Sequence, residues 1–332
     1  MKRKLVFERA MLGLLVGCVA AYTGFVIQNP VERKAAISNP ALLAEAYEAA
    51  AVITDAGQTL ALRPVEVVPL AKNDPTQALN YSLATVSTGE TVVPRIFLTS
   101  LPGEIDKARE TAERKELFFK SVLPLVLRVN EEIAKDRKRL WDIRFRRNLG
   151  LKVDALDRLW LDSMAEQYSV RHGDIDGLLA RVDVIPPSLA LAQAAEESGW
   201  GRSRFAKEGN ALFGQWTYST QHKGIEPTAR DEGATHRIRA FDNLAQGVRA
   251  YMKNLNSHRA YRGLRKMRQN MRATGSPLDG YLLAGALTRY SARGENYVVA
   301  LRSIMEGNGL AAFDDARLHG TNVPKAPQKP FI

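Results

Sequence analysis

Hydrophobic and polar positions divide the chain into four parts. Residues 10–31 carry no charged side chain and follow a basic cluster, so residues 1–31 are predicted to form a signal anchor with a transmembrane helix. Residues 32–100 mix Val/Pro runs with Ser, Thr and Gly, which predicts a stalk or poorly ordered spacer. Apolar residues at helical spacing then predict a folded body over residues 101–312, before a flexible tail over residues 313–332.

The first half of this body is predicted to be helical. Apolar rows lie on either side of Pro124, which is expected to break or kink the helix. Residues 131–147 are rich in charge and predict a solvated helix face. A second apolar stripe at helical spacing predicts core packing and consists of Leu156, Leu159, Trp160 and Met164. Residues 174–181 predict another short helix.

The pattern over residues 185–201 predicts one helix that is buried on all sides. Prolines at positions 186 and 187 suit its start, and Gly199 stands where a helix ends in a left-handed residue. Apolar side chains point in almost every direction around this helix. The rest of the body is therefore expected to pack around it.

Gln193 and Glu197 interrupt this apolar helix and share one stripe, because they are four residues apart. Burial raises the pKa of a carboxyl group, and a general acid near neutral pH requires a raised pKa. Glu197 is therefore a candidate general acid. The alternative is that Glu197 forms a structural ion pair with Arg202 or Arg204, since such pairs also shift pKa values.

The second half of the body combines a small β region with further helices. Residues 212–218 and 236–241 predict a β-hairpin across an irregular polar loop. Asp242 or Asn243 is expected to cap the next helix. The closing apolar segments are residues 281–290 and 297–305. The predicted fold class is α+β and mostly helical, with helices around one buried helix and a small β-hairpin lobe.

Composition and charge limit the classes of partner and function that fit this chain. The 332 residues are 45% hydrophobic and 25% charged, as in a globular protein. A net charge of +11 favours anionic lipid head groups, cell-wall polymers or nucleic acid, and nucleic acid is least favoured because no recognition motif occurs. Cys18 is the only cysteine, which excludes an intramolecular disulfide, and the five histidines are not in metal-ligand spacing. We expect no metal or organic cofactor.

Two alternatives to an uncleaved anchor remain open. The segment Leu15–Cys18 fits a bacterial lipoprotein cleavage site, with attachment through the cysteine. Small residues near Ala20 and Ala21 fit a cleaved signal peptide and secretion to the periplasm. The basic residues before the apolar run favour an N-terminus in the cytoplasm and a body outside it.

The sequence AQAAEESGWG at positions 192–201 is followed by Ser203–Ala206 and by Gly209–Gly214. This arrangement resembles the glucosaminidase domain family of peptidoglycan hydrolases, and within it the Bax group of Gram-negative bacteria, over roughly residues 100–312. The resemblance implies a lysozyme-like catalytic domain with a cleft between two lobes. It also implies that Glu197, the glutamate before Ser-Gly-Trp, is the catalytic acid.

Glu196 departs from the family pattern, in which this position is commonly apolar. It points about 100° away from Glu197 on the helix and is interpreted as a charge at the rim of the site.

The resemblance implies further candidates for catalysis. Tyr290 matches a tyrosine that related enzymes place near the acid, and Glu226 lies in the β-lobe loop where they place a second carboxylate. Glu232 lies in the same loop. A solvated loop charge is the alternative for both glutamates, and the substrate's own N-acetyl group is a further alternative to a second acid.

Substrate-binding candidates come from the same motifs and are Gln193, Trp200, Asn210, Phe213, Trp216 and Tyr297. Tryptophan rings suit a sugar face, although Trp200 is equally compatible with a core position, and the tyrosines are compatible with buried, hydrogen-bonded hydroxyls. Asn254, Asn256 and His258 are interpreted as capping groups at a helix end.

The sequence thus leads to the hypothesis of a peptidoglycan hydrolase that binds glycan strands. It would be an endo-β-N-acetylglucosaminidase with one glutamate as general acid, held in the inner membrane by a single span with its catalytic body in the periplasm. The alternatives are a muramidase or lytic transglycosylase on the same fold, and a non-catalytic cell-wall binding or scaffold protein.

Overall fold

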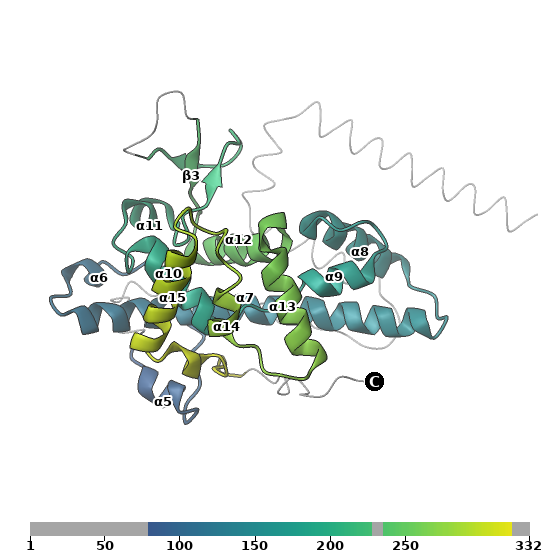
Figure 1. Ribbon diagram of the computed structural model, residues 1–332, viewed down its shortest axis with the longest axis horizontal. Coiled ribbons are helices and arrows are strands. Elements are labelled where there is room, and N and C mark those ends of the chain that lie inside the picture. Colours follow the sequence, from purple (N-terminus) through teal and green to yellow (C-terminus); the bar gives the residue numbers. More distant parts are fainter. Residues whose placement is uncertain (1–78, 228–234, 321–332) are drawn as a thin grey trace, which may run out of the picture. The chain divides into compact units, whose positions relative to one another are not determined.

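The computed structural model describes residues 79–227 and 235–320 and shows a mostly helical body with a small antiparallel sheet, as predicted (Figure 1). Its elements are α5 (Leu83–Ser87), α6 (Glu104–Lys107), α7 (Thr111–Asn148), α8 (Ala155–Tyr168), α9 (Ile175–Arg181), α10 (Pro187–Ser198), α11 (Arg204–Gly209), β1 (Trp216–Thr217), β2 (Gly224–Ile225), β3 (Arg237–Arg239), α12 (Leu244–Ser257), η1 (Arg259–Tyr261), α13 (Arg262–Ala273), α14 (Gly280–Ala284), α15 (Glu295–Gly307) and η2 (Leu310–Phe313).

The anchor predicted for residues 1–31 lies outside the described residues, as does most of the predicted spacer. Within the described ranges, no helix combines the length and the apolar character needed to cross a bilayer.

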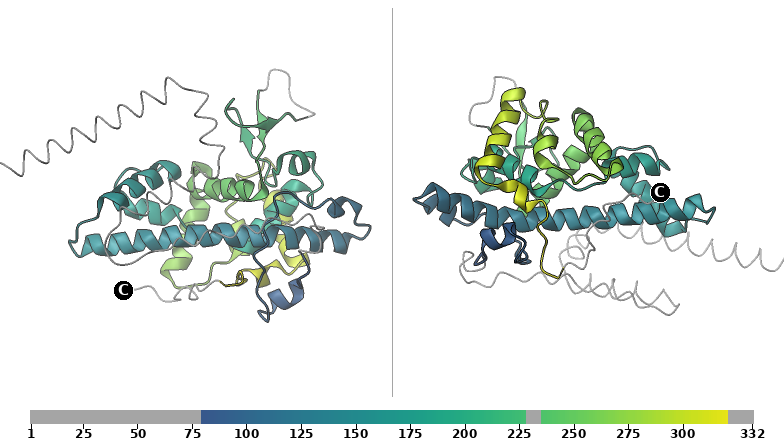
Figure 2. Two further views of the ribbon diagram at one scale, coloured as in Figure 1. Left: turned by 180° about the vertical axis from the view of Figure 1, so that it is seen from behind. Right: turned by 60° about the horizontal axis from the view of Figure 1, so that its bottom comes forward.

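Helix α7 is a single helix of 38 residues that runs along the described body, and α9, α10 and α12 pack against it (Figure 2). Pro124 does not break it, so the expected break is wrong. A proline leaves the carbonyl four residues earlier without its helical donor, here the carbonyl of Lys120. The hydroxyl of Tyr81 donates to that carbonyl at 3.1 Å and replaces the missing bond. The helix continues because a distant side chain satisfies the freed group.

Helix α10 is buried on nearly all sides, as predicted, and packs against α7, α14, α15 and η2. It ends at Gly199, whose left-handed backbone has φ 57°. Pro186, at its start, has no side chain that can cap the free N–H groups. The carboxylate of Asp314 takes this role, because it accepts from Ser188 N at 2.7 Å and from Ser188 Oγ at 2.8 Å.

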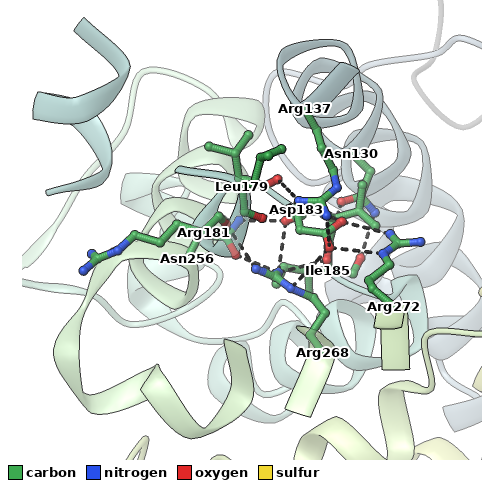
Figure 3. A network of polar contacts seen from close by, with 11 residues as sticks. Asn130, Arg137, Leu179, Arg181, Asp183, Ile185, Asn256, Arg268 and Arg272 are labelled. Carbon is green, nitrogen blue, oxygen red and sulfur yellow. Dashed lines mark hydrogen bonds and ion pairs between the residues drawn. The ribbon is translucent and has the colours of Figure 1, made fainter. Parts of the chain in front are cut away.

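A buried ion cluster fixes the segment that leads into α10 (Figure 3). Asp183 is 3% exposed, and Arg272 of α13 binds its carboxylate through two nitrogens at 2.8 and 3.1 Å. Arg137 of α7 and the fully buried Arg268 of α13 each lie 3.7 Å from the same carboxylate. Burial opposes ionisation of Asp183, but these three guanidinium groups outweigh it and lower the carboxyl pKa. The aspartate is therefore a buried anion.

The same segment is bonded through its backbone. Arg268 Nη1 donates to the carbonyl of Asp183 at 3.0 Å, and Asn256 Nδ2 donates to it at 2.8 Å. The amide of Asn130 binds both the N–H and the carbonyl of Ile185, at 3.1 and 2.7 Å. These bonds satisfy a buried, non-helical stretch of backbone, which thereby fixes where α10 begins.

The small sheet has the strand order β1-β3-β2, with both pairs antiparallel. The predicted pairing of the two flanking segments is confirmed by the register of Trp216 with Ile238. The intervening loop is less irregular than expected, because β2 lies within it and pairs with the other edge of β3. Asn243 caps α12 by accepting from Gln246 N at 3.0 Å.

The predicted core stripe of α8 is wrong in part. Leu156 and Leu159 are 73% and 68% exposed, whereas Leu161 and Met164 are buried. Asp157 is bonded to Arg139 and Arg146 of α7, so a neighbouring face of α8 is turned toward the body. Trp160 is half-buried beneath the guanidinium of Arg139, which lies 4.4 Å from its ring centre.

The folded body extends beyond residues 101–312. Leu79, Val86 and Leu98 contribute buried side chains to the core, although they lie in the region predicted to be a spacer. Val93 pairs in parallel with Leu318, which places part of the predicted tail against the body. Of the predicted closing segment 281–290, only residues up to Ala284 are helical, and α13 was not predicted.

The ion cluster gives a stability prediction. Asp183→Asn leaves three guanidinium groups without their common anion, so we expect a loss of about 3–5 kcal/mol in the free energy of unfolding. Asp157→Asn is the matched control, because its two arginines are 42% and 35% exposed and water can solvate them. It should cost about 1 kcal/mol. Equal shifts of the urea midpoint for the two variants would contradict the role assigned to Asp183.

Candidate active site

Glu197 lies in the last turn of α10 and is half-buried, although Ala194, Ala195 and Ser198 around it are buried. Burial raises the pKa of its carboxyl group, and the nearby charge of Glu196 raises it further. A hydrogen bond from Tyr297 and the charge of Arg293 act in the opposite direction. The net pKa is raised, so Glu197 holds its proton to higher pH than an ordinary glutamate.

A chain of buried hydrogen bonds ends at Glu197. Tyr251 donates from its hydroxyl to Gln193 Oε1 at 2.7 Å, and Gln193 Nε2 donates to the hydroxyl oxygen of Tyr297 at 2.9 Å. The amide of Gln193 is therefore held with its nitrogen toward Tyr297. Since Tyr297 accepts from Gln193, its own proton is directed to the carboxylate of Glu197. Gln193 and Glu197, which share one stripe of the helix, are therefore linked through the hydroxyl of Tyr297.

The phenols around Glu197 stay protonated at neutral pH. Burial raises the pKa of Tyr251, Tyr290 and Tyr297, and the charge of Glu197 contributes in each case. Tyr290 stacks on Tyr297 with ring centres 5.4 Å apart and donates to the carbonyl of Phe213 at 3.3 Å. Tyr290 therefore packs against Tyr297, the partner of Glu197. Its hydroxyl binds the loop that contains Phe213.

The glycine-bounded loop after α11 lies against the acid. A β-carbon built at Gly214 would lie 3.8 Å from Glu197 Oε2. Asn210 adopts the left-handed conformation that ends α11, with φ 51°, and donates to the carbonyl of Phe241 at 3.1 Å. The ring of Phe213 is only 3% exposed and stacks on Tyr251 at 3.8 Å. Phe213 is therefore a core residue that contributes its carbonyl to the site, rather than an open floor for substrate.

The two tryptophans differ. Trp200 packs edge-on against Phe118 and Phe119 of α7, with ring centres 5.9 and 5.4 Å away, which favours the core position. Trp216 on β1 is 62% exposed and stacks on His236 at 4.3 Å. Trp216 is therefore an exposed aromatic ring of the β lobe.

The charged candidates have other partners than the sequence suggested. Arg204 binds Glu208 at 3.4 Å and the backbone carbonyl of Glu226 at 2.5 Å, and no ion pair joins it to Glu197 in the described ranges. Glu226 directly follows β2, and Glu232 lies outside the described residues. The acid placed beside Glu197 is Glu196, which pairs with Arg293 at 2.5 Å.

Three residues of this site were missed by sequence reasoning. Tyr251 occupies an apolar stripe of α12 and resembles a core residue, and no local pattern distinguishes Arg293. Tyr261 lies beside Tyr290, with ring centres 5.7 Å apart. Of the predicted capping groups, His258 does cap η1, by accepting from Ala260 N at 3.3 Å, whereas Asn256 belongs to the ion cluster.

Comparison with known proteins identifies the family. Residues 176–310 match the sequence model of the glucosaminidase family, described as mannosyl-glycoprotein endo-beta-N-acetylglucosaminidase. The protein Bax of Escherichia coli K12 is 30% identical over 216 residues, which cover 63% of this chain and 75% of that protein. The catalytic domain of the autolysin Auto from Listeria monocytogenes aligns over 49% of this chain and 89% of its own, with 17% identity and a TM-score of 0.29.

The family match and the similarity to Bax carry the assignment, and the family match includes α10 and the tyrosines that surround its final turn. The sequence-based resemblance is confirmed. This chain belongs to the glucosaminidase family of glycoside hydrolases and is related to Bax.

Proposed function

We propose that this protein is an endo-β-N-acetylglucosaminidase that cleaves peptidoglycan glycan strands after N-acetylglucosamine, with Glu197 as general acid. The observation that carries the proposal is the half-buried Glu197 carboxyl, whose pKa is raised by burial while Tyr297 donates a hydrogen bond to it. Glycoside hydrolysis needs such a group to protonate the leaving oxygen.

The surroundings of Glu197 suit both stages of proton transfer. Burial raises the pKa of Glu197 and so favours the protonated form before the reaction. As the proton moves to the glycosidic oxygen, Glu197 becomes a carboxylate. The hydroxyl of Tyr297 then stabilises that charge, and Gln193 and Tyr251 hold the hydroxyl in place. Tyr297 and Gln193 are accordingly positioning groups for the acid.

The oxocarbenium-like transition state needs a second contribution. Glu196 is held by Arg293 and shares the helix with Glu197, which makes it a poor partner across a sugar ring. Glu226 at the edge of the β lobe, the Tyr290 hydroxyl and the substrate's N-acetyl group are the remaining candidates. The exposed ring of Trp216 is proposed to stack on a sugar at the same lobe.

The cellular setting follows from the charge-free run of residues 10–31 behind a basic cluster. We propose that this segment anchors the protein in the inner membrane and that the catalytic body lies in the periplasm. Recovery of the full-length protein in the soluble periplasmic fraction would contradict the anchor.

The assignment of the acid is tested by Glu197→Gln. Loss of a general acid should lower kcat/KM on purified peptidoglycan by about 100-fold or more. Glu196→Gln is the matched control, because it removes the adjacent carboxylate of the same helical turn and should retain most activity at its own optimum pH. Full activity of Glu197→Gln would show that another group protonates the leaving oxygen.

The bond choice is tested by the new chain ends that the wild-type protein releases. A reducing N-acetylglucosamine end is expected, identified by borohydride reduction and mass spectrometry. A reducing muramic acid end would indicate a muramidase, and an anhydro-muramic end a lytic transglycosylase. No release from any peptidoglycan would favour the scaffold alternative.

The pKa of Glu197 predicts how the pH profile responds to two substitutions. The acid works only while protonated, so activity falls as pH rises through its pKa. Tyr297→Phe removes a bond that lowers this pKa, and the alkaline limb of kcat/KM should move to higher pH. Glu196→Gln removes a charge that raises it, and the limb should move to lower pH. Shifts in the same direction would contradict this electrostatic account.

A further inference from the structure

An open cavity of about 820 Å³ is lined by residues from the end of α12, η1, the start of α13 and the turn after α14. Its lining includes His258, Arg259, Arg262, Ala286, Thr288 and Arg289. Glu197 does not line it, so the cavity is distinct from the place where the acid acts.

The cavity is strongly cationic. The side chains of Arg259, Arg262 and Arg289 are exposed, and no carboxylate is among the lining residues. Within residues 79–227 and 235–320, none of these three guanidinium groups is paired with an acid. By contrast, Arg265 and Arg268, which lie on α13 with Arg262, donate to protein carbonyls and are buried. The three lining arginines therefore present their donors to whatever enters the cavity.

A layer of aromatic rings connects the cavity to the acid. The ring of His258 lies 5.7 Å from that of Tyr261, which lies 5.7 Å from Tyr290. Tyr290 stacks on Tyr297, and Tyr297 is bonded to Glu197. Arg289 directly precedes Tyr290 in the chain. The rings of Tyr261, Tyr290 and Tyr297 therefore separate the cavity from Glu197.

We propose that this cavity binds the carboxylates of the peptide attached to the glycan strand, next to the sugar bond that Glu197 cleaves. This inference rests on the proposed function and adds to it a substrate class, namely peptide-bearing rather than peptide-free strands. Guanidinium groups bind carboxylates through paired, charge-assisted hydrogen bonds, and three such groups without internal partners match a peptide with several acidic groups. The lining also includes the uncharged residues Thr288 and Ala286, which we expect to face the peptide backbone.

Binding to a catalytically inactive background tests the proposal independently of turnover. Glu197→Gln protein is titrated calorimetrically with a glycan fragment that carries its peptides and with the same fragment stripped of them by an amidase. The peptide-bearing fragment should bind roughly tenfold more tightly. Adding Arg259→Gln, Arg262→Gln and Arg289→Gln should remove that difference and leave the affinity for the stripped fragment unchanged.

A matched control removes the same charge elsewhere. Lys135→Gln, Lys138→Gln and Lys152→Gln replace three exposed cations in the C-terminal half of α7 and after it, and should keep the tenfold preference. Both triple variants should unfold at the wild-type temperature, since all six side chains are exposed.

Equal affinity for the two fragments, or a preference that survives loss of the three arginines, overturns the proposal. Binding of inorganic phosphate to the three arginines, without any preference between the two fragments, also overturns the proposal, because the cavity would then be a phosphate site. Failure of the wild-type protein to cleave either strand, while the binding preference persists, contradicts the proposed function alone.

Discussion

The hydrogen bond from Tyr297 to Glu197 is the interaction on which the candidate site depends. A carboxyl group at the end of a buried helix resists ionisation, and that resistance keeps it loaded as an acid. The same burial would also oppose loss of its proton during the reaction. The Tyr297 hydroxyl offsets this by binding the carboxylate, and Gln193 fixes its direction. The site therefore balances two opposing effects on one proton.

This balance requires α10 to stay in place, and the structure holds the helix at both ends. At its start, the Asp183 cluster and the Asp314 carboxylate bind backbone that would otherwise be buried without partners. At its end, Gly214 and the rings of Tyr290 and Tyr297 surround Glu197. A buried anion among three arginines contributes little to stability relative to an apolar replacement, but it fixes one geometry for the segment it binds.

Much of this arrangement could be predicted from local sequence. The prolines and Gly199 that bound α10, its apolar surface and the shared stripe of Gln193 and Glu197 all have local causes. The remaining features depend on partners far along the chain. Pro124 stays within α7 because Tyr81, which binds a carbonyl 39 residues away, replaces the missing bond. Leu156 is exposed because α8 turns the face that carries Asp157 toward α7, where Asp157 binds Arg146. Arg268 lies in a basic stretch that resembles a surface helix, yet it is fully buried.

The surroundings of Glu197 raise the pKa of its carboxyl group and thereby favour the protonated acid. The most direct test is an NMR titration of its side-chain carboxyl carbon in the wild-type protein, with the resonance assigned by its absence from Glu197→Gln. The midpoint should lie above 4.5, the ordinary glutamate value. A midpoint at or below that value would show an ionised carboxylate at neutral pH, and Glu197 would then not be the proton donor.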